Sequence, residues 1–360
     1  MKKYFILLFF ILLVSTGCFD YTELNDMAIV SGISLDYEEN GYHVGFEILN
    51  TVSKDDNQNQ PKVYLVEGYG TSISEAFSDA TLEVAKYPYL AHLKTLIIDE
   101  EIAENHVKDI IDFLIRDNHV RNIFYLALAR DTSALTILKN TDTNNPVVST
   151  AVAKLIDSNI FSDNIAANLN YEQFVTNIID PRKDTYVSSL EIENGVIKLG
   201  PLAIFSGYNM QTYLTSEESV TFNAMQGEAK EMHFQVPCPN DPENFVVLTS
   251  FNKPKSGIEI EEQTVKISTE IETRIVENHC TMNFKEVETY ESIQEAVEKD
   301  LKESMKNLME KLIANDSDIL KIKQVYYQKY KMDKDFKGLD YNYDAKVIIN
   351  RNGLIFEVEE

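Results

Sequence analysis

The first part of the chain alternates between strand-like and helix-like hydrophobic patterns. Apolar runs at 27–35, 42–51 and 62–70 are typical of β-strands, and Asn40-Gly41 between the first two predicts a hairpin turn. Helical spacing of apolar positions then alternates with buried-looking strands, which predicts helices near 73–84 and 101–116 and strands within 92–99 and 123–129. This alternation indicates a mixed α/β domain, which we assign to residues 18–195.

The middle of the chain has shorter elements with more loop residues between them. We expect helices near 148–160 and 171–179, a hairpin of strands 186–192 and 196–205 that turns at Asn194-Gly195, and a helix near 215–225. Segments 237–244 and 252–257 are rich in Pro, Asn and Lys and are predicted to be loops. The second loop marks a boundary, so the middle domain is assigned to 196–256.

The last hundred residues have the most regular pattern. Apolar and polar side chains alternate strictly over 265–275, which predicts a long strand with one face in water. A long amphipathic helix at 291–313 is predicted from apolar residues at i+3 and i+4 spacing, namely Ile293, Val297, Leu301, Met305, Leu308 and Leu312. A second helix near 318–331 and strands 342–350 and 354–358 complete an α+β domain at 257–360, in which the helix packs on an antiparallel sheet. The fold class predicted for the whole chain is multidomain α+β or mixed α/β, with two to three domains and helices packed on sheets.

The N-terminus has the pattern of an export signal. Lys2 and Lys3 precede 11 unbroken apolar residues at 4–14, a helix of roughly 16 Å that is too short to cross a hydrocarbon core of about 30 Å. Ser15-Thr16-Gly17-Cys18 follows and resembles a bacterial lipobox, with Ser15 where leucine is usual. The pattern predicts that residues 1–17 are a cleaved lipoprotein signal peptide and that Cys18 carries a diacylglyceryl group. The alternative is an ordinary secretory signal with an incidental cysteine.

Charge excludes two kinds of partner. The 360 residues contain 33 Lys and Arg against 58 Asp and Glu, and removing the two lysines of the signal leaves a net charge of −27. Such a body is repelled by phosphate backbones and by anionic lipid head groups, so neither nucleic-acid binding nor a broad basic membrane surface is expected. Stable anchoring usually needs two acyl chains, and a diacylglyceryl cysteine supplies them. No later segment reaches 18 consecutive apolar residues, so the mature chain is not expected to span a membrane.

Candidate chemistry is sparse. The six histidines form no HExxH or His-x-x-x-His pair, and no nucleophile elbow, P-loop or dinucleotide fingerprint is present, so we expect no catalytic residue, metal or cofactor. The stretch Asp142-Thr143-Asn144-Asn145 lacks the glycine and the bidentate glutamate of a calcium loop and is interpreted as a polar turn. Cys238 and Cys280 either form a disulfide or remain two free thiols. Their spacing along the chain does not distinguish these two states, and we favour free thiols.

Longer segments of the sequence resemble one family. Cys18-Phe19-Asp20 and Glu23-Leu24-Asn25 lead into AIVSGISLD at 28–36, and this N-terminus is similar to that of the C subunits of spore germinant receptors, the Ger(x)C lipoprotein family. The resemblance continues through YLAHLKTLIIDEEIAE at 89–104, GPLAIFSGYNMQTYLTSEES at 200–219 and DILKIKQVYYQKY at 318–330. It departs at Phe19, where tryptophan is usual, at Asp99, where glycine is usual, and at 320–322, where glycines of the family are replaced by Leu-Lys-Ile. These departures put in doubt a glycine-dependent turn at 99 and the loop geometry near 321.

The resemblance implies a protein of three mixed α/β domains without enzymatic activity, lipid-anchored to the outer leaflet of the spore inner membrane. Its implied partners are an integral-membrane transporter-like receptor subunit and a receptor subunit with both soluble and membrane parts. It implies a non-catalytic accessory subunit needed for nutrient-triggered spore germination. Two other classes share the export signal. A solute-binding lipoprotein requires two comparable lobes around a cleft, and a lipoprotein hydrolase requires an assembled nucleophile or acid pair.

Overall fold

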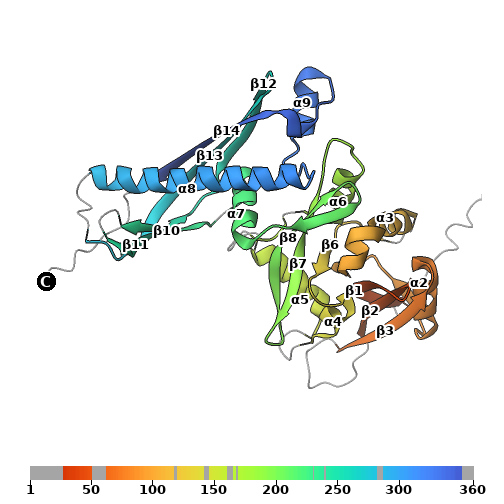
Figure 1. Cartoon of the computed structure of the whole chain (residues 1–360). Coiled ribbons are helices and arrows are strands. Elements are labelled where there is room, and N and C mark those ends of the chain that lie inside the picture. The colour runs from red at the N-terminus through yellow and green to blue at the C-terminus, as the bar shows by residue number, and fades with distance from the viewer. Residues whose placement is uncertain are drawn as a thin grey trace, which may run out of the picture.

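The chain folds into two bodies that meet around helix α7 (Ser216–Met225), as Figure 1 shows. The computed structural model describes residues 27–50, 62–116, 120–141, 146–159, 165–167, 169–229, 231–238, 241–281 and 287–350. The predicted signal peptide, Cys18, His119, the polar stretch 142–145 and the predicted strand 354–358 therefore lie outside the described residues.

The first body is built on a nine-stranded mixed sheet in the order β3-β2-β1-β5-β6-β7-β8-β9, with β4 added beside β1. Strands β1, β5, β6 and β7 pair in parallel, and antiparallel hairpins extend the sheet at both edges. The strands are β1 (Met27–Glu38), β2 (Gly41–Asn50), β3 (Lys62–Gly70), β4 (Tyr87–Tyr89), β5 (Thr95–Ile98), β6 (Tyr125–Ala129), β7 (Tyr186–Glu193), β8 (Val196–Ser206) and β9 (Asn209–Tyr213).

Helices cover both faces of this sheet, which explains why its central strands are continuously apolar. In β5, Leu96 and Ile98 point into one hydrophobic cluster, while Ile97 between them points into the other. The first cluster contains α2 (Ile73–Leu82), η2 (Ile102–His106), α3 (Val107–Arg116) and α6 (Tyr171–Ile178), and the second contains α4 (Ala134–Lys139) and α5 (Val148–Asn159).

The second body packs a long helix on a five-stranded sheet. Helix α8 (Val287–Ala314) buries every apolar position that the sequence predicted, and β13 (Thr264–Asn278) buries alternate residues, so both predictions are confirmed. The remaining elements are β10 (His233–Cys238), β11 (Asp241–Ser250), β12 (Lys255–Glu261), α9 (Ile322–Tyr330), η3 (Phe336–Gly338) and β14 (Asp340–Ile349). The predicted fold class, mixed α and β in several domains, is confirmed.

Three local predictions were wrong. The second sheet is mixed rather than antiparallel, because the chain passes through α8 and α9 before β14 returns parallel to β13. Segments 237–244 and 252–257 are not simply loops: β10 and β11 occupy most of the first, and β12 begins at Lys255 in the second and pairs with β13. Pairing with a neighbouring strand overrides their Pro and Asn content. Helix α4 was in addition missed, since its six residues are too few for a recognisable period.

The two thiols are also not free. Cys238 at the end of β10 and Cys280 just beyond β13 form a disulfide with Cα atoms 5.8 Å apart across 42 residues of sequence. Strand β11 pairs with both β10 and β13, and this pairing brings the two cysteines together. Spacing along the chain contains no such information, which is why the prediction of free thiols was wrong.

Strands β8 and β9 belong to the first sheet, so the hairpin β7–β8 crosses residue 195, where we expected one domain to end.

Polar contacts join the two bodies. Lys311 on α8 forms an ion pair of 2.6 Å with Glu218 on α7. Asp184, just before β7, accepts from the Asp318 N–H at 2.7 Å and from Lys323 Nζ at 3.1 Å. Within the described residues, no helix has the length and apolar character needed to cross a bilayer.

Candidate functional site

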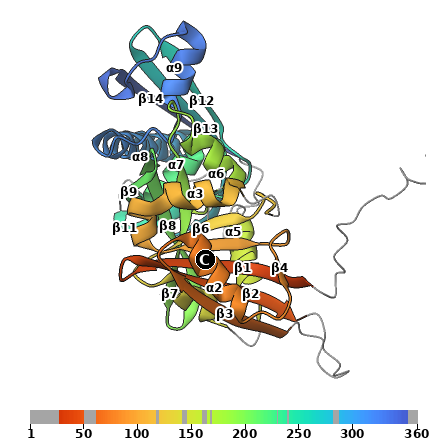
Figure 2. The same cartoon turned by 90° about the vertical axis from the view of Figure 1, so that its right-hand side faces the viewer.

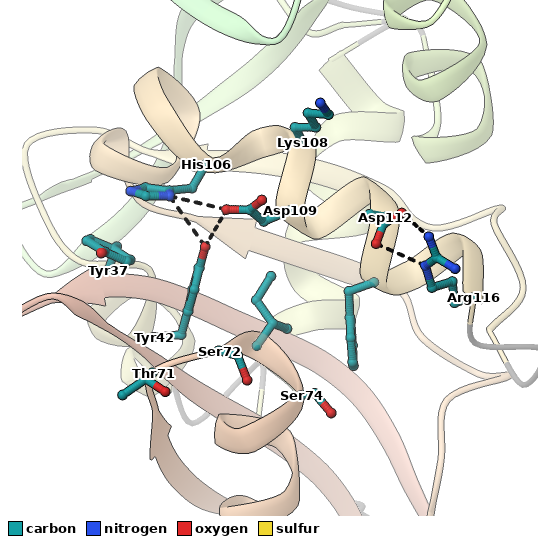
Figure 3. Close-up of a pocket in the computed structure, with 12 residues that line it drawn as sticks. Tyr37, Tyr42, Thr71, Ser72, Ser74, His106, Lys108, Asp109, Asp112 and Arg116 are labelled. Atoms are coloured by element: carbon teal, nitrogen blue, oxygen red, sulfur yellow. Dashed lines mark hydrogen bonds and ion pairs between the residues drawn. The ribbon is translucent and has the colours of Figure 1, made fainter.

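A cavity of about 1080 Å³ lies in the first body, between the β1–β2 hairpin, the N-terminus of α2 and the length of α3 (Figure 3). Its lining mixes rings, hydroxyls and charges, namely Tyr37, Tyr42, Thr71, Ser72, Ile73, Ser74, His106, Lys108, Asp109, Asp112, Phe113 and Arg116. Its size and its mixed apolar and polar lining suit a small ligand, so we take it as the candidate binding site.

Helix periodicity places one wall of the cavity. His106, Asp109, Phe113 and Arg116 follow one another at spacings of three and four residues, so they share one face of η2 and α3. The opposite face is buried in the sheet through Val107, Ile110, Ile111 and Leu114. The core therefore fixes the direction in which the polar side chains point.

Three side chains form a hydrogen-bonded group at one end of the cavity. The Tyr42 hydroxyl donates to Asp109 Oδ2 at 2.8 Å, and His106 Nδ1 lies 3.4 Å from both of these oxygens. Tyr37 stacks on the His106 ring with centroids 4.0 Å apart. Burial, together with the Asp109 carboxylate, raises the pKa of Tyr42, so its phenol stays protonated and acts as a donor.

Four other polar side chains of the wall, Thr71, Ser72, Asp112 and Arg116, have hydrogen-bond partners. Arg116 pairs with Asp112 through two hydrogen bonds of 2.9 Å, and both side chains are exposed. Ser72 accepts from the Glu75 N–H at 3.2 Å as the N-cap of α2, and Thr71 Oγ1 donates to Glu75 at 2.8 Å. Glu75 also accepts from the Thr71 N–H at 2.8 Å, so its contact with the Thr71 hydroxyl belongs to the turn that begins α2. The arrangement is suited to stacking and hydrogen bonding.

Asp99, which stands where the sequence resemblance has glycine, has a structural role. Its carboxylate accepts from the Tyr37 N–H and from the Ile102 N–H, both at 2.9 Å, and so ties the beginning of η2 to the end of β1. Burial raises the pKa of this carboxyl group. The side chain therefore holds the turn that leads to the cavity without a glycine.

Other residues considered from the sequence do not gather at this site. The disulfide cysteines lie in the second body. His43 is buried, lies 3.1 Å from Glu67 and stacks on Tyr69, as expected of a satisfied core histidine. None of the cavity residues was recognised as a site residue from the sequence. The signal available in the sequence was the spacing of polar residues, three and four positions apart, along the predicted helix 101–116.

Comparison with known proteins bears on the whole chain. The profile described as "Spore germination protein N-terminal domain" matches residues 20–192, and the one described as "Spore germination B3/ GerAC like, C-terminal" matches 201–353. The chain belongs to the Ger(x)C family of spore germination proteins. In this Ger(x)C protein the profile named for an N-terminal domain matches the first half, and the profile named for a C-terminal domain matches the second.

Individual relatives agree over nearly their full length. Spore germination protein GerQC of Bacillus cereus is 20% identical over 98% of this chain and 99% of the relative. Spore germination protein B3 of Bacillus subtilis (strain 168) is 24% identical over 98% of each chain. The crystal structure of the GerBC protein matches with a TM-score of 0.57 and 18% identity, covering 92% of this chain and 99% of that one, which shows a shared fold.

The departure from the family at 320–322 is also visible in this Ger(x)C protein. Lys321 has φ of +63°, in the left-handed region that glycine adopts at little cost. Here a lysine adopts that conformation.

Proposed function

We propose that this chain is a non-catalytic, lipid-anchored accessory subunit of a spore germinant receptor, needed for nutrient-triggered germination. The observation that carries the proposal is the ordered match of both family profiles, together with relatives named as spore germination proteins over almost their whole length. In this proposal the subunit contacts an integral-membrane transporter-like subunit and a subunit with soluble and membrane parts.

The anchor is proposed to be Cys18. Residues 15–18 resemble a lipobox after an apolar stretch of 11 residues, and a diacylglyceryl group supplies the two acyl chains that stable anchoring needs. The protein is then held on the outer leaflet of the spore inner membrane. Confinement to this surface raises its effective concentration near the membrane-embedded subunits.

The absence of catalysis is part of the same proposal. It is supported by the cavity, where the Ser72 hydroxyl caps α2, the Thr71 hydroxyl donates to the Glu75 carboxylate and the phenol of Tyr42 is held protonated. These groups are placed to bind and to hold the fold.

The proposal is tested by Cys18→Ala in sporulating cells. We expect the variant to lose metabolically incorporated fatty acid and to give spores that respond poorly to the nutrient read by this receptor. Phe19→Trp, which restores the aromatic residue usual in the family beside an intact thiol, is the control and retains both properties. Normal membrane retention and a normal nutrient response in Cys18→Ala would contradict the proposal.

The cavity itself favours a second candidate, a solute-binding lipoprotein that delivers a small molecule to a membrane transporter. Its size suits a small ligand. However, it lies within one body rather than between two lobes. Calorimetry of the lipid-free chain against amino acids, sugars and nucleosides separates the two candidates, because tight binding of any of these supports the second.

A further inference from the structure

The end of the first body where the described chain begins gathers several loops. Strands β1, β5 and β6 are parallel, so their N-terminal ends lie at one edge of the sheet. Tyr87 in β4 pairs beside Met27, and Lys94 bridges the strands because its N–H donates to Ser31 at 2.8 Å and its carbonyl accepts from Tyr125 at 3.0 Å. In Figure 2, β4 lies alongside β1 at this end.

Large apolar and aromatic side chains are exposed on these loops. Leu82, the last residue of α2, is 82% exposed, Tyr87 is 55% exposed and Ile123 is 66% exposed. Single exposed hydrophobic residues are common on proteins, but here three lie on segments that converge on one edge. Tyrosine is suited to a position where one end of the ring is apolar and the other is in water.

Three cations lie on the same segments as these apolar side chains. Lys86, Lys94 and Arg121 lie beside these apolar side chains, and no ion pair links any of the three to a carboxylate in the described part of the chain. Glu83, Glu172 and Asp157 border the group: the Glu172 N–H donates to the Asn122 carbonyl at 3.0 Å, and the Tyr125 hydroxyl donates to Asp157. On a chain with net charge −25, an edge whose cations offset the bordering carboxylates is repelled less by an anionic surface than the chain as a whole.

We propose that this edge, defined by Leu82, Lys86, Tyr87, Lys94, Arg121 and Ile123 and called the basal patch, rests on the anionic phospholipid surface. The inference deepens the proposed function and rests on it, since the number of residues between Cys18 and Met27 limits how far the fold can lie from the membrane. Cys18 precedes Met27 by nine residues, which span at most about 30 Å when extended. The basal patch is therefore the part of the described fold that the anchor keeps closest to lipid.

The same geometry directs the cavity away from lipid. Tyr37 lies near the far end of β1, a strand of 12 residues that is roughly 40 Å long. With the basal patch on the membrane, the ring and hydroxyl groups around Tyr37 and Tyr42 face the aqueous side, where small molecules and the soluble part of another subunit are found.

The sequence offers a direct test because it contains no tryptophan. Cys238 and Cys280 are joined, so the thiol of Cys18 is available to couple chain 18–360 to a maleimide lipid in vesicles containing phosphatidylglycerol. Ile123→Trp then reports from the basal patch. Val196→Trp, at a side chain 58% exposed on the turn after β7, is the matched control, because β7 runs parallel to β6 and places this turn at the opposite edge.

We expect brominated lipids to quench the emission of Ile123→Trp and to shift it to the blue, and to leave Val196→Trp unchanged. Adding Lys86→Glu, Lys94→Glu and Arg121→Glu to the Ile123→Trp chain removes the quenching, with folding checked by circular dichroism. Equal quenching of both reporters, or none of either, overturns the proposal. Protection of Ile123→Trp only when the membrane subunits are present also overturns it, in favour of a protein contact.

Coupling through maleimide makes the outcome independent of natural lipidation. If Cys18 is not lipidated in cells, the proposed anchor fails while the vesicle experiment still measures whether the basal patch meets lipid. If the reporter is not quenched although Cys18 is lipidated in cells, the inference fails and the proposed function stands.

Discussion

At the scale of single residues, a buried carboxyl group couples folding to pH. Asp36 in β1 accepts from the N–H groups of Ala134 and Leu135 at 2.5 and 2.9 Å, at the N-terminus of α4. Burial nevertheless raises the pKa of Asp36 from 3.8 to about 7, against the effect of these two donors. The first sheet therefore contains an acid that the fold keeps protonated in mild acid.

The sign of the pH effect follows from proton linkage. Between pH 4 and pH 7 the unfolded chain has lost this proton while the folded chain retains it, so the free energy of unfolding falls as pH rises through this range. The contribution is on the order of 3–4 kcal/mol. Asp318, whose pKa burial also raises to about 7, acts in the same direction.

We predict that Asp36→Asn lowers the dependence of stability on pH. Urea unfolding at pH 5 and pH 8 gives the free energy of unfolding for each chain, and the difference between the two pH values is smaller in the variant than in the wild type. Asp112→Asn, at an exposed ion pair, is the control and leaves the difference nearly unchanged. An equal pH difference in Asp36→Asn and in the wild type would contradict the burial argument.

At the scale of elements, the disulfide ties the hairpin β10–β11 to the end of β13. It closes a loop of 42 residues, for which loop-closure entropy predicts a stabilisation of roughly 4 kcal/mol. Cys238→Ser with Cys280→Ser is expected to lower the free energy of unfolding by about this amount, measured by urea denaturation. Wild-type chain reduced before unfolding is the comparison, and a midpoint unchanged in both would show that the bridge does not stabilise the fold.

The elements also show which parts of the fold can be predicted from the sequence. Helix α8 and strand β13 were predicted because each buries one face over many residues, and their periods of 3.6 and 2 remain visible without a structure. Helix α4 is too short for such a period, and the parallel pairing of β14 with β13 depends on where the chain returns after two helices.

The candidate site was harder to predict than the fold. The polar period of His106, Asp109 and Arg116 was present in the sequence, but Tyr37 and Tyr42 reach the same cavity from another element. Their contact with His106 arises from the hairpin between β1 and β2. The disulfide was hard to predict for the same reason, since its two cysteines lie on separate segments that strand β11 brings together.

At the scale of the whole molecule, side-chain contacts fix one body against the other. Asp184 in the first body accepts from the backbone and from Lys323 in the second, and Ser317 Oγ donates to the Phe205 carbonyl at 2.7 Å. Arg182 pairs with Asp333 at 2.6 Å and lies over the Tyr327 ring, 3.7 Å from its centroid. An anchor at Cys18, as proposed, would therefore constrain the second body together with the first.

The central claim is that a lipid at Cys18 holds this acidic protein beside the other subunits of a receptor. Mass spectrometry of the N-terminal peptide from the membranes of purified spores tests it most directly. The account predicts a chain that begins at Cys18 with a diacylglyceryl thioether on its sulfur. A chain that retains residues 1–17, or an unmodified Cys18 thiol recovered with the soluble proteins, would contradict it.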